Sequence, residues 1–386
     1  MQLKYANKKN KKDILLKGGK FKLVQVKEVQ GAGNMLIAGD NLKALKCLLF
    51  DLKLRNSIDL VYIDPPFATN NVFKIGTDRA NTISSSQLDE VAYEDTLAGA
   101  DFIEFLRQRL ILLRELMSDK ASIYLHIDYK IGHYVKIVMD EIFGVKNFRN
   151  DITRIKCSPK NFSRRAYGNI KDLILFYTMS SKYTWNETRV PLLENDVEKL
   201  FKKRNKTGRQ YTTVPLHAPG ETNGGATGKP WRGIAPPKGR HWRSAPDVLD
   251  KLDKDGLIEW SATGVPRKII YADEAEKKGK KLQDIWEFKD PMYPEYPTEK
   301  NIDLLEMIIK TSSNECDLVL DCFAGSGTTI LAADKLKRRW IGIDQSEHAI
   351  KLIEKRVKKI ESDLFRRKSG CMFYRLIDEN HRHLQM

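Results

Sequence analysis

Cysteine is scarce in this chain of 386 residues, and long apolar runs are missing. There are five cysteines: Cys47, Cys157, Cys316, Cys322 and Cys371. They are odd in number and show no CxxC spacing, so neither a disulfide framework nor a zinc site is expected. No apolar stretch approaches the roughly 18–20 residues that a membrane helix needs. Residues 1–27 also lack the apolar segment of a secretory signal. We expect a reduced cytoplasmic protein with no metal site and no membrane contact.

Acidic residues are outnumbered by basic ones. Lys+Arg total 67 and Asp+Glu total 51, which gives a formal net charge of +16 at pH 7. Hydrophobic residues make up 41% of the chain, which is enough to bury a core and excludes global disorder. The excess of positive charge favours a polyanionic partner, and nucleic acid is the first candidate. Charge alone does not separate a nucleic-acid enzyme from a passive binding protein.

Apolar strands and amphipathic helices alternate along two stretches of the chain. Between about residues 180 and 290 the alternation stops, and Gly, Pro, Lys, Arg and Trp become frequent, which predicts a loop-rich insertion with little regular core. Outside it, the alternation predicts an α/β fold with a mainly parallel sheet. The predicted strands are 35–38, 58–63, 121–127, 172–177, 317–320 and 339–343. The predicted helices are 42–54, 102–117, 131–143, 299–310, 330–336 and 347–364.

Residues 1–33 contain a lysine run and few apolar residues. We interpret this segment as a basic arm that is either solvated or in contact with phosphates. The remaining segments are 34–179, the insertion 180–290, and 291–386.

A glycine-rich turn follows the predicted strand 317–320. From Asp321 to Thr329 the sequence reads Asp-Cys-Phe-Ala-Gly-Ser-Gly-Thr-Thr. Glycines at such a strand-to-helix turn let a ligand approach the backbone closely. The turn is not a Walker A loop and lacks the third glycine of the dinucleotide fingerprint. Asp344 ends the next strand about twenty residues later, a spacing that suits a carboxylate bound to ribose hydroxyls. The pattern favours a nucleoside ligand without a pyrophosphate, such as S-adenosylmethionine; an ordinary turn is the alternative.

A second motif, Asp64-Pro65-Pro66-Phe67, directly follows the predicted strand 58–63. The two prolines fix the backbone and remove N–H donors. Asp64 and the Pro65 carbonyl can together accept both hydrogens of an exocyclic amine, and Phe67 can stack on a flat base. A structural turn is the alternative for this motif taken alone. Two such motifs, each at the end of an apolar strand, favour a functional site.

Together with Gly39-Asp40-Asn41 and Pro297-Thr298-Glu299-Lys300, these motifs resemble the β-class DNA adenine-N6 amino-methyltransferases. The chain is similar to the methylation subunits of type III restriction-modification systems and to related type II methyltransferases. The resemblance implies a Rossmann-like, seven-stranded class I methyltransferase sheet that is circularly permuted and carries an inserted target-recognition region. Residues 34–179 would be the catalytic half, 180–290 the target-recognition insertion, and 291–386 the half that binds S-adenosylmethionine.

The resemblance also implies roles for individual residues. Asp40 would accept from the adenine amine of the cofactor and Asp344 would bind its ribose, while Lys300 and a helix N-terminus would hold its carboxylate. The implied catalytic residues are Asp64, Pro65, Pro66 and Phe67. The implied cofactor-binding residues are Asp40, Thr298, Lys300, Asp321, Phe323, Gly325, Ser326, Gly327, Thr328 and Asp344.

Cations and aromatics interleave in the insertion, a pattern that suits phosphate contacts, stacking and base readout. For each residue the alternative is structural: the tryptophans would form a small core of the insertion and the cations would be solvated. The predicted DNA-contacting residues are Arg204, Arg209, Trp231, Arg232, Arg240, Trp242 and Arg243.

The activity implied by the resemblance is methyl transfer from S-adenosylmethionine to the N6 amine of an adenine flipped out of double-stranded DNA, within a restriction-modification system. The chain has no Pro-Cys dipeptide of the kind that cytosine-C5 enzymes use. Asp64 before the two prolines favours adenine over cytosine-N4, which stays an alternative, as does a non-catalytic DNA-binding subunit with a degenerate methyltransferase fold. The implied partners are duplex DNA, a second copy of the chain and a cognate restriction endonuclease.

Overall fold

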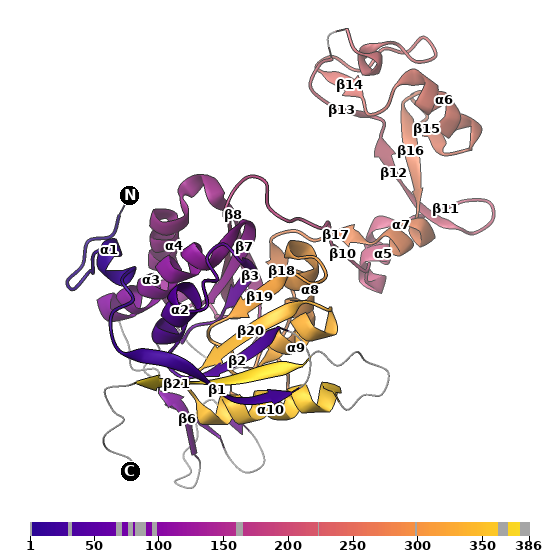
Figure 1. Cartoon of the computed structure of the whole chain (residues 1–386). Helices are drawn as coiled ribbons and strands as arrows, with labels where there is room; N and C mark the ends of the chain where they lie inside the picture. The colour runs from indigo at the N-terminus through magenta and orange to yellow at the C-terminus, as the bar shows by residue number, and fades with distance from the viewer. Residues whose placement is uncertain are drawn as a thin grey trace. The chain divides into compact units, whose positions relative to one another are not determined.

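The computed structural model describes residues 2–29, 33–66, 72–75, 80–81, 90–94, 99–159, 165–222, 224–297, 299–361 and 370–378. The chain forms two compact units (Figure 1). Unit 1 comprises Met1–Thr188 and Gln283–Met386, and unit 2 is Arg189–Leu282. Among the described residues, no helix is long and apolar enough to cross a membrane.

Unit 1 is built on a ten-stranded sheet of order β1-β21-β2-β20-β19-β3-β7-β9-β8-β18. The pairs from β21 through to β7 are parallel, and β7–β9 and β9–β8 are antiparallel. The predicted α/β fold with a mainly parallel sheet is therefore confirmed. The strands from β2 to β8 supply the seven expected, and β1, β21 and β18 extend the edges. The bounds are β1 Phe21–Val29, β21 Cys371–Asp378, β2 Asn34–Ala38, β20 Arg339–Asp344, β19 Leu318–Asp321, β3 Ile58–Ile63, β7 Met117–Ile127, β9 Lys171–Thr178, β8 Phe148–Ile155 and β18 Ile285–Trp286.

Helices flank this sheet on both sides (Figure 1). On one side lie α2 (Asn41–Phe50), α3 (Gly99–Leu116) and α4 (Tyr129–Phe143). On the other lie α8 (Ile302–Ser312), α9 (Thr328–Lys335) and α10 (Glu347–Glu361). Each corresponds to a predicted helix, although α2 ends before the predicted residue 54 because Lys53 turns to a φ of 55°. The smaller elements are α1 Lys11–Ile14, the 3-10 helix Val145–Asn147, and the strands β4 Val72–Ile75, β5 Ala80–Asn81 and β6 Glu90–Glu94 of a separate sheet.

The order of the strands brings the two halves of unit 1 together. β3 pairs in parallel with β19, with Leu60 opposite Val319. The Leu318 N–H donates to Asp59, which lies 259 residues earlier, at 3.1 Å. The carboxyl ends of parallel neighbours open onto the same edge of a sheet. The segments that follow β3 and β19 therefore meet at one edge, as a permuted sheet requires.

The N-terminal residues fold against unit 1. β1 pairs with β21, Ile14 is 3% exposed, and the Tyr5 hydroxyl donates to Glu104 at 2.6 Å. Lys8 forms an ion pair with Glu141 at 2.7 Å. Parts of the predicted basic arm are therefore anchored on unit 1, by partners elsewhere in the chain that local composition did not reveal. Lys9, Lys11 and Lys12 of its lysine run are exposed.

Unit 2 lies within the predicted insertion but has more regular structure than expected. Its sheets have the orders β11-β12-β16-β15, β13-β14 and β10-β17. Two small cores hold it together, one around Trp231 and Trp242 and one around Val197 and Phe201. The elements are β10 Arg189–Val190, α5 Glu194–Leu200, β11 Lys203–Arg204, β12 Gln210–Pro215, β13 His217–Pro219, the 3-10 helix Ala226–Gly228, β14 Arg240–Trp242, α6 Pro246–Lys254, β15 Ile258–Trp260, β16 Pro266–Tyr271, α7 Ala272–Lys278 and β17 Lys280–Lys281.

Candidate active site

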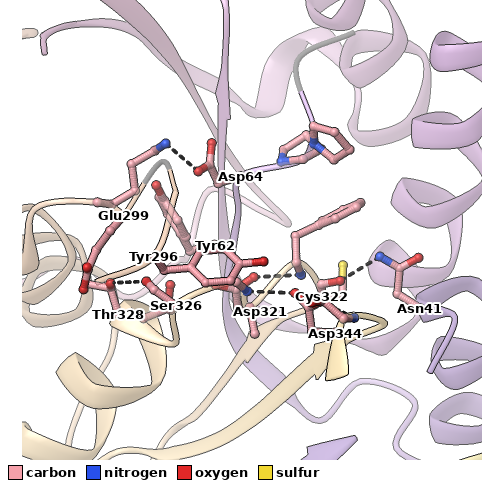
Figure 2. Close-up of a pocket in the computed structure, with 18 of the residues that line it drawn as sticks. Asn41, Tyr62, Asp64, Tyr296, Glu299, Asp321, Cys322, Ser326, Thr328 and Asp344 are labelled. Carbon is pink, nitrogen blue, oxygen red and sulfur yellow. Dashed lines mark hydrogen bonds and ion pairs between the residues drawn. The ribbon is translucent and has the colours of Figure 1, made fainter. Parts of the chain in front are cut away.

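A pocket of about 630 Å³ opens in unit 1 where β3 and β19 end (Figure 2). Its size is in the range of small-molecule sites. Residues from both halves of unit 1 line it. Ten predicted site residues are among them: Asp64, Pro65, Pro66, Lys300, Asp321, Phe323, Gly325, Ser326, Thr328 and Asp344.

Of the other four predicted residues, only Asp40 and Gly327 belong to the described part of the chain, and neither lines the pocket. Phe67 and Thr298 lie outside the described residues. Asp40 caps the N-terminus of α2, accepting from the Lys43 N–H at 2.9 Å, and its neighbour Asn41 lines the pocket instead. Gly327 is the N-cap residue of α9.

The geometry around Gly327 explains this glycine without a ligand. Its φ is 81°, in the left-handed region that favours glycine. A Cβ atom there would lie 2.7 Å from the side chain of Ile353 in α10. The residue therefore serves the turn and the packing of α10, whereas Gly325 faces the pocket.

Asp64 is held by an ion pair. Its Oδ2 lies 2.7 Å from Nζ of Lys300, and the two side chains are only 16% and 9% exposed (Figure 2). The other oxygen, Oδ1, is buried and has no hydrogen-bond partner among the described residues. A buried acceptor without a partner is costly to leave unsatisfied. One carboxylate oxygen is thus fixed by a cation, and the other has no donor among the described residues.

The position of Lys300 differs from the expectation. The predicted helix 299–310 would include this lysine in its first turn, but α8 begins at Ile302. Asn301 caps the helix, accepting from the Asp303 N–H at 2.8 Å. Lys300 therefore precedes the helix, and its amino group contacts the catalytic candidate Asp64.

Two further carboxylates face the pocket at the other strand ends (Figure 2). Burial raises the pKa of Asp321 to about 7, although hydrogen bonds from Thr329 and the Phe323 N–H oppose the rise. Burial also raises the pKa of Asp344, whose oxygens accept from the Gly325 and Ser346 N–H groups at 2.8 Å each. Neither acid has a cationic partner among the described residues, so the lining attracts a positively charged ligand.

An aromatic residue that the sequence reasoning did not single out, Phe105, also lines the pocket. The rings of Phe105, in α3, and Phe323 lie 6.0 Å apart. The guanidinium of Arg109 sits 3.5 Å over the Phe105 ring, and burial lowers the Arg109 pKa to about 10. Phe105 and Arg109 belong to a regular amphipathic helix, so no motif marked them. Such rings provide a flat apolar surface for a heterocycle.

Behind the pocket, Tyr62 leads into a buried polar network. Its hydroxyl lies 2.9 Å from His126 Nδ1, and His126 Nε2 lies 3.3 Å from Asp172. Burial opposes ionisation of Asp172, but the His126 hydrogen bond and the Lys156 charge outweigh it and lower the Asp172 pKa. Ionised Asp172 accepts a hydrogen bond from the Nε2–H group of His126. Nδ1 therefore carries no proton and accepts a hydrogen bond from the Tyr62 hydroxyl. Because burial also lowers the His126 pKa, the imidazole is neutral and fixes the end of β3.

In unit 2 the structure separates the predicted DNA-contacting residues into two groups. Trp231 and Trp242 are each 1% exposed and pack edge-to-face, so their indoles form a core and are not available for stacking on bases. Arg209 is paired with Asp273 and Glu274, and Arg232 with Asp250 and Asp253. Arg204 donates to the Gly208 carbonyl. Only Arg240 and Arg243 are exposed with no carbonyl or carboxylate bound to the guanidinium among the described residues.

One exposed aromatic of unit 2 was missed by the sequence reasoning. Trp260 is 38% exposed and its ring stacks on Trp231, with centroids 5.5 Å apart. It lies at the end of β15, outside the basic segment where aromatics were sought. Of Trp231, Trp242 and Trp260, it is the one whose side chain is accessible to solvent.

Comparisons with known protein families, sequences and structures identify relatives of this chain. The model of a family described as DNA methylase matches residues 58–355. The type II methyltransferase M.EcaI of Enterobacter cloacae is 43% identical over 331 residues, which cover 84% of this chain and 69% of that protein. The Mod subunit of the type III restriction-modification enzyme StyLTI of Salmonella typhimurium is 27% identical over 340 residues, covering 78% of this chain and 50% of that subunit.

The chain thus spans about half the length of the type III relative. Among solved structures, the PvuII DNA methyltransferase, titled as cytosine-N4-specific, has a TM-score of 0.47 at 13% identity, covering 84% of this chain and 87% of that one.

Proposed function

The chain belongs to the DNA methylase family, and we propose that it transfers a methyl group from S-adenosylmethionine to the N6 amine of an adenine flipped out of duplex DNA. The observation that carries this proposal is the state of Asp64. One of its oxygens is bound to Lys300 at 2.7 Å, and the other is buried without a partner. Such an oxygen suits an amine donor that arrives with the substrate.

The pocket lining fits the proposed cofactor. S-adenosylmethionine carries a sulfonium and an ammonium, and the pocket carboxylates Asp321 and Asp344 have no cation partner among the described residues. Phe105 and Phe323 offer rings beside which its adenine can lie. Asp344 would bind the ribose, and Gly325, Ser326 and Thr328 would line the methionine part. When bound, the cofactor supplies an electrophilic methyl group.

The catalytic contribution of the chain is orientation of the amine. The N6 nitrogen is a weak nucleophile because its lone pair is delocalised into the purine ring. Asp64 Oδ1 and the Pro65 carbonyl would each accept one N6–H, which localises the lone pair and turns it away from both acceptors. Lys300 keeps the carboxylate from rotating. Positioning and electrostatics carry the reaction, with no covalent enzyme intermediate.

The same sheet edge would receive the flipped base, because a base inside a duplex cannot reach a methyl donor in a closed pocket. Unit 2 would supply target recognition as the inserted segment between the two halves of unit 1. The names of the relatives support a place in a restriction-modification system, with a cognate endonuclease as partner.

Nucleoside analysis tests the proposal. Genomic DNA from cells that express the wild-type chain would be digested to nucleosides and examined by mass spectrometry, with Asp64→Asn as the matched control. We expect N6-methyladenine with the wild type and its loss with the variant, which retains the shape of the side chain but loses its charge. N4-methylcytosine would identify the cytosine-N4 alternative. No methylated base, together with absent cofactor binding by the purified protein, would favour a degenerate subunit.

A further inference from the structure

Three arginines of unit 2 converge on one histidine. Arg240 belongs to β14, Arg243 follows that strand directly, and Arg267 belongs to β16. Arg240 Nη1 lies 3.1 Å from His217 Nδ1 in β13. The backbone N–H of Arg243 donates to the carbonyl of Leu216, the residue before His217, at 2.7 Å. We call Arg240, Arg243, Arg267 and His217 the arginine cluster.

Among the described residues one carboxylate lies beside the cluster: Glu259 is opposite Arg267 in the pairing of β15 with β16, where it is bound by Lys203. None of its arginines forms an ion pair in the part of the chain that the structure describes. By contrast, Arg209 is bound by Asp273 at 2.8 Å and by Glu274 at 2.7 Å, and Arg232 is bound by Asp253. Unit 2 therefore contains two kinds of arginine, one neutralised within the unit and one not.

The charges of all three arginines act on His217. Burial and then the charges of Arg240, Arg243 and Arg267 lower the pKa of His217 below its ordinary 6.5. The imidazole is therefore neutral at pH 7 and adds no further positive charge. Its Nδ1 accepts from the Arg240 guanidinium and orients it.

A packed framework supports the cluster. Trp242, next to Arg243, is 1% exposed and its Nε1–H donates to the Lys229 carbonyl at 3.1 Å. The Arg267 guanidinium donates to the Thr213 hydroxyl at 2.9 Å and to the Thr213 carbonyl at 2.8 Å. Arg240 and Arg243 are exposed at their strand ends. Arginines with fixed stems and accessible tips are suited to bind phosphate oxygens with little loss of conformational freedom.

We propose that the arginine cluster binds the phosphate backbone of duplex DNA, and that it, rather than Arg209 and Arg232, is the main electrostatic contact of unit 2. This inference rests on the proposed function. Like charges held together without counterions repel one another, and an anion relieves that repulsion. A guanine edge occupies one guanidinium, whereas several cations in one cluster match the closely spaced phosphates of a duplex.

The salt dependence of DNA binding tests the proposal. Affinity for a duplex of arbitrary sequence would be measured by fluorescence anisotropy over a range of salt concentrations. The double variant Arg240→Gln/Arg243→Gln is expected to bind more weakly, with a plot of log K against log[salt] that is shallower by about 0.9 for each lost phosphate contact. The matched control Arg209→Gln/Arg232→Gln removes the same charge from the same unit and is expected to keep the wild-type slope.

Two outcomes would overturn the inference without touching the proposed function. In the first, the wild type methylates DNA but the Arg240→Gln/Arg243→Gln variant keeps its salt slope. In the second, that variant methylates different sequences instead of losing affinity evenly, which would mean that the cluster reads bases. A wild type that methylates no DNA would instead contradict the proposed function. Unchanged cofactor affinity and unfolding temperature show that the variant is folded.

Discussion

Units 1 and 2 use charged residues in opposite ways. In unit 1 the functional candidates are acids at strand ends, and Asp321 is only 3% exposed. In unit 2 the functional candidates are arginines at the surface. Fixed acceptors in a desolvated pocket orient one bond of a substrate, because electrostatic interactions are strong where water is excluded. Exposed cations attract a polyanion with less demand on geometry.

The hydrophobic cores of the two units also differ in size. One large cluster, from Ile14 in α1 to Ile343 in β20, packs α2, α3 and α4 against one face of the large sheet of unit 1. Unit 2 has two small clusters, and the larger contains only Leu216, Trp231, Trp242, Leu249 and Ile258 as buried members. Precision at the pocket is thus supported by a large core, whereas the proposed DNA-contacting surface depends on a few large side chains.

The largest expected effect concerns the core of unit 2. Trp242→Ala should remove about 3–5 kcal/mol of stability, because the indole is 1% exposed and packs against Trp231. Hydrogen exchange would locate the loss, which we expect in unit 2 peptides only. Equal loss of protection in the β3 and β19 peptides would show that the two units unfold together. It would contradict the view that their cores stabilise them separately.

Lys300→Met addresses the pocket of unit 1. If the lysine mainly holds Asp64, kcat should fall about 10- to 100-fold, as expected for a misplaced catalytic group. The dissociation constant of S-adenosylmethionine should change less than about threefold, since this step needs no methyl transfer. Lys300→Arg retains a cation and should recover part of kcat. Loss of cofactor affinity without a change in kcat would favour the carboxylate-binding role implied by the sequence motif.

The pH dependence of cofactor binding tests the buried acid. With a pKa of about 7, Asp321 is protonated below neutrality and no longer attracts a cation. Affinity measured by calorimetry should therefore fall as pH drops below 7, by up to about tenfold per pH unit. Asp321→Asn should bind weakly at every pH. A wild-type affinity that stays constant from pH 8 to 6 would contradict this role.

The buried carboxyl group of Asp321 also makes the stability of the folded protein depend on pH. Because the folded protein holds the Asp321 proton up to about pH 7 while the ordinary pKa is 3.8, its contribution to stability is present below pH 3.8 and is lost as pH rises to 7. Urea unfolding of the cofactor-free protein should show this decrease in the wild type and a smaller one in Asp321→Asn.

The smallest effect is expected at a surface charge of unit 1. Lys17 pairs with Asp51, but the two side chains are 44% and 33% exposed. Lys17→Ala should change the free energy of unfolding by less than about 1 kcal/mol, because solvent and salt screen such pairs. A larger loss in denaturant titrations would mean that ion pairs, and not burial of Ile14, hold the N-terminal residues on the domain.

Much of the fold followed from local patterns. The strand 58–63 and the helix 131–143 were recognisable because burial imposes a fixed periodicity on short segments. The strand β8, the edge strands β1 and β18, and β21, which pairs between β1 and β2, were not predicted. β1 contains FKLVQVKEV, in which lysines interrupt the apolar positions, as is common at a sheet edge.

The residues of the candidate site likewise fall into those that the sequence revealed and those that it did not. Asp64 and Asp321 were found because each ends a strand with an unusual motif. Phe105 and Arg109 were missed because their positions resemble any amphipathic helix, and Trp231 was taken as a DNA contact because sequence does not distinguish a buried indole from an exposed one. The role of Arg209 was likewise hidden, since its partners Asp273 and Glu274 lie on another element.

The sequence by itself determined the strand-end motifs, the excess of positive charge and the interruption of the α/β pattern, because each is a property of neighbouring residues. Only the tertiary structure decided that Lys300 pairs with Asp64, that the tryptophans are buried and that Arg240 and Arg243 lack acidic partners among the described residues. Ion pairing and burial depend on which distant segments meet. Those meetings are fixed by the sheet order of unit 1 and the small cores of unit 2, which no local pattern encodes.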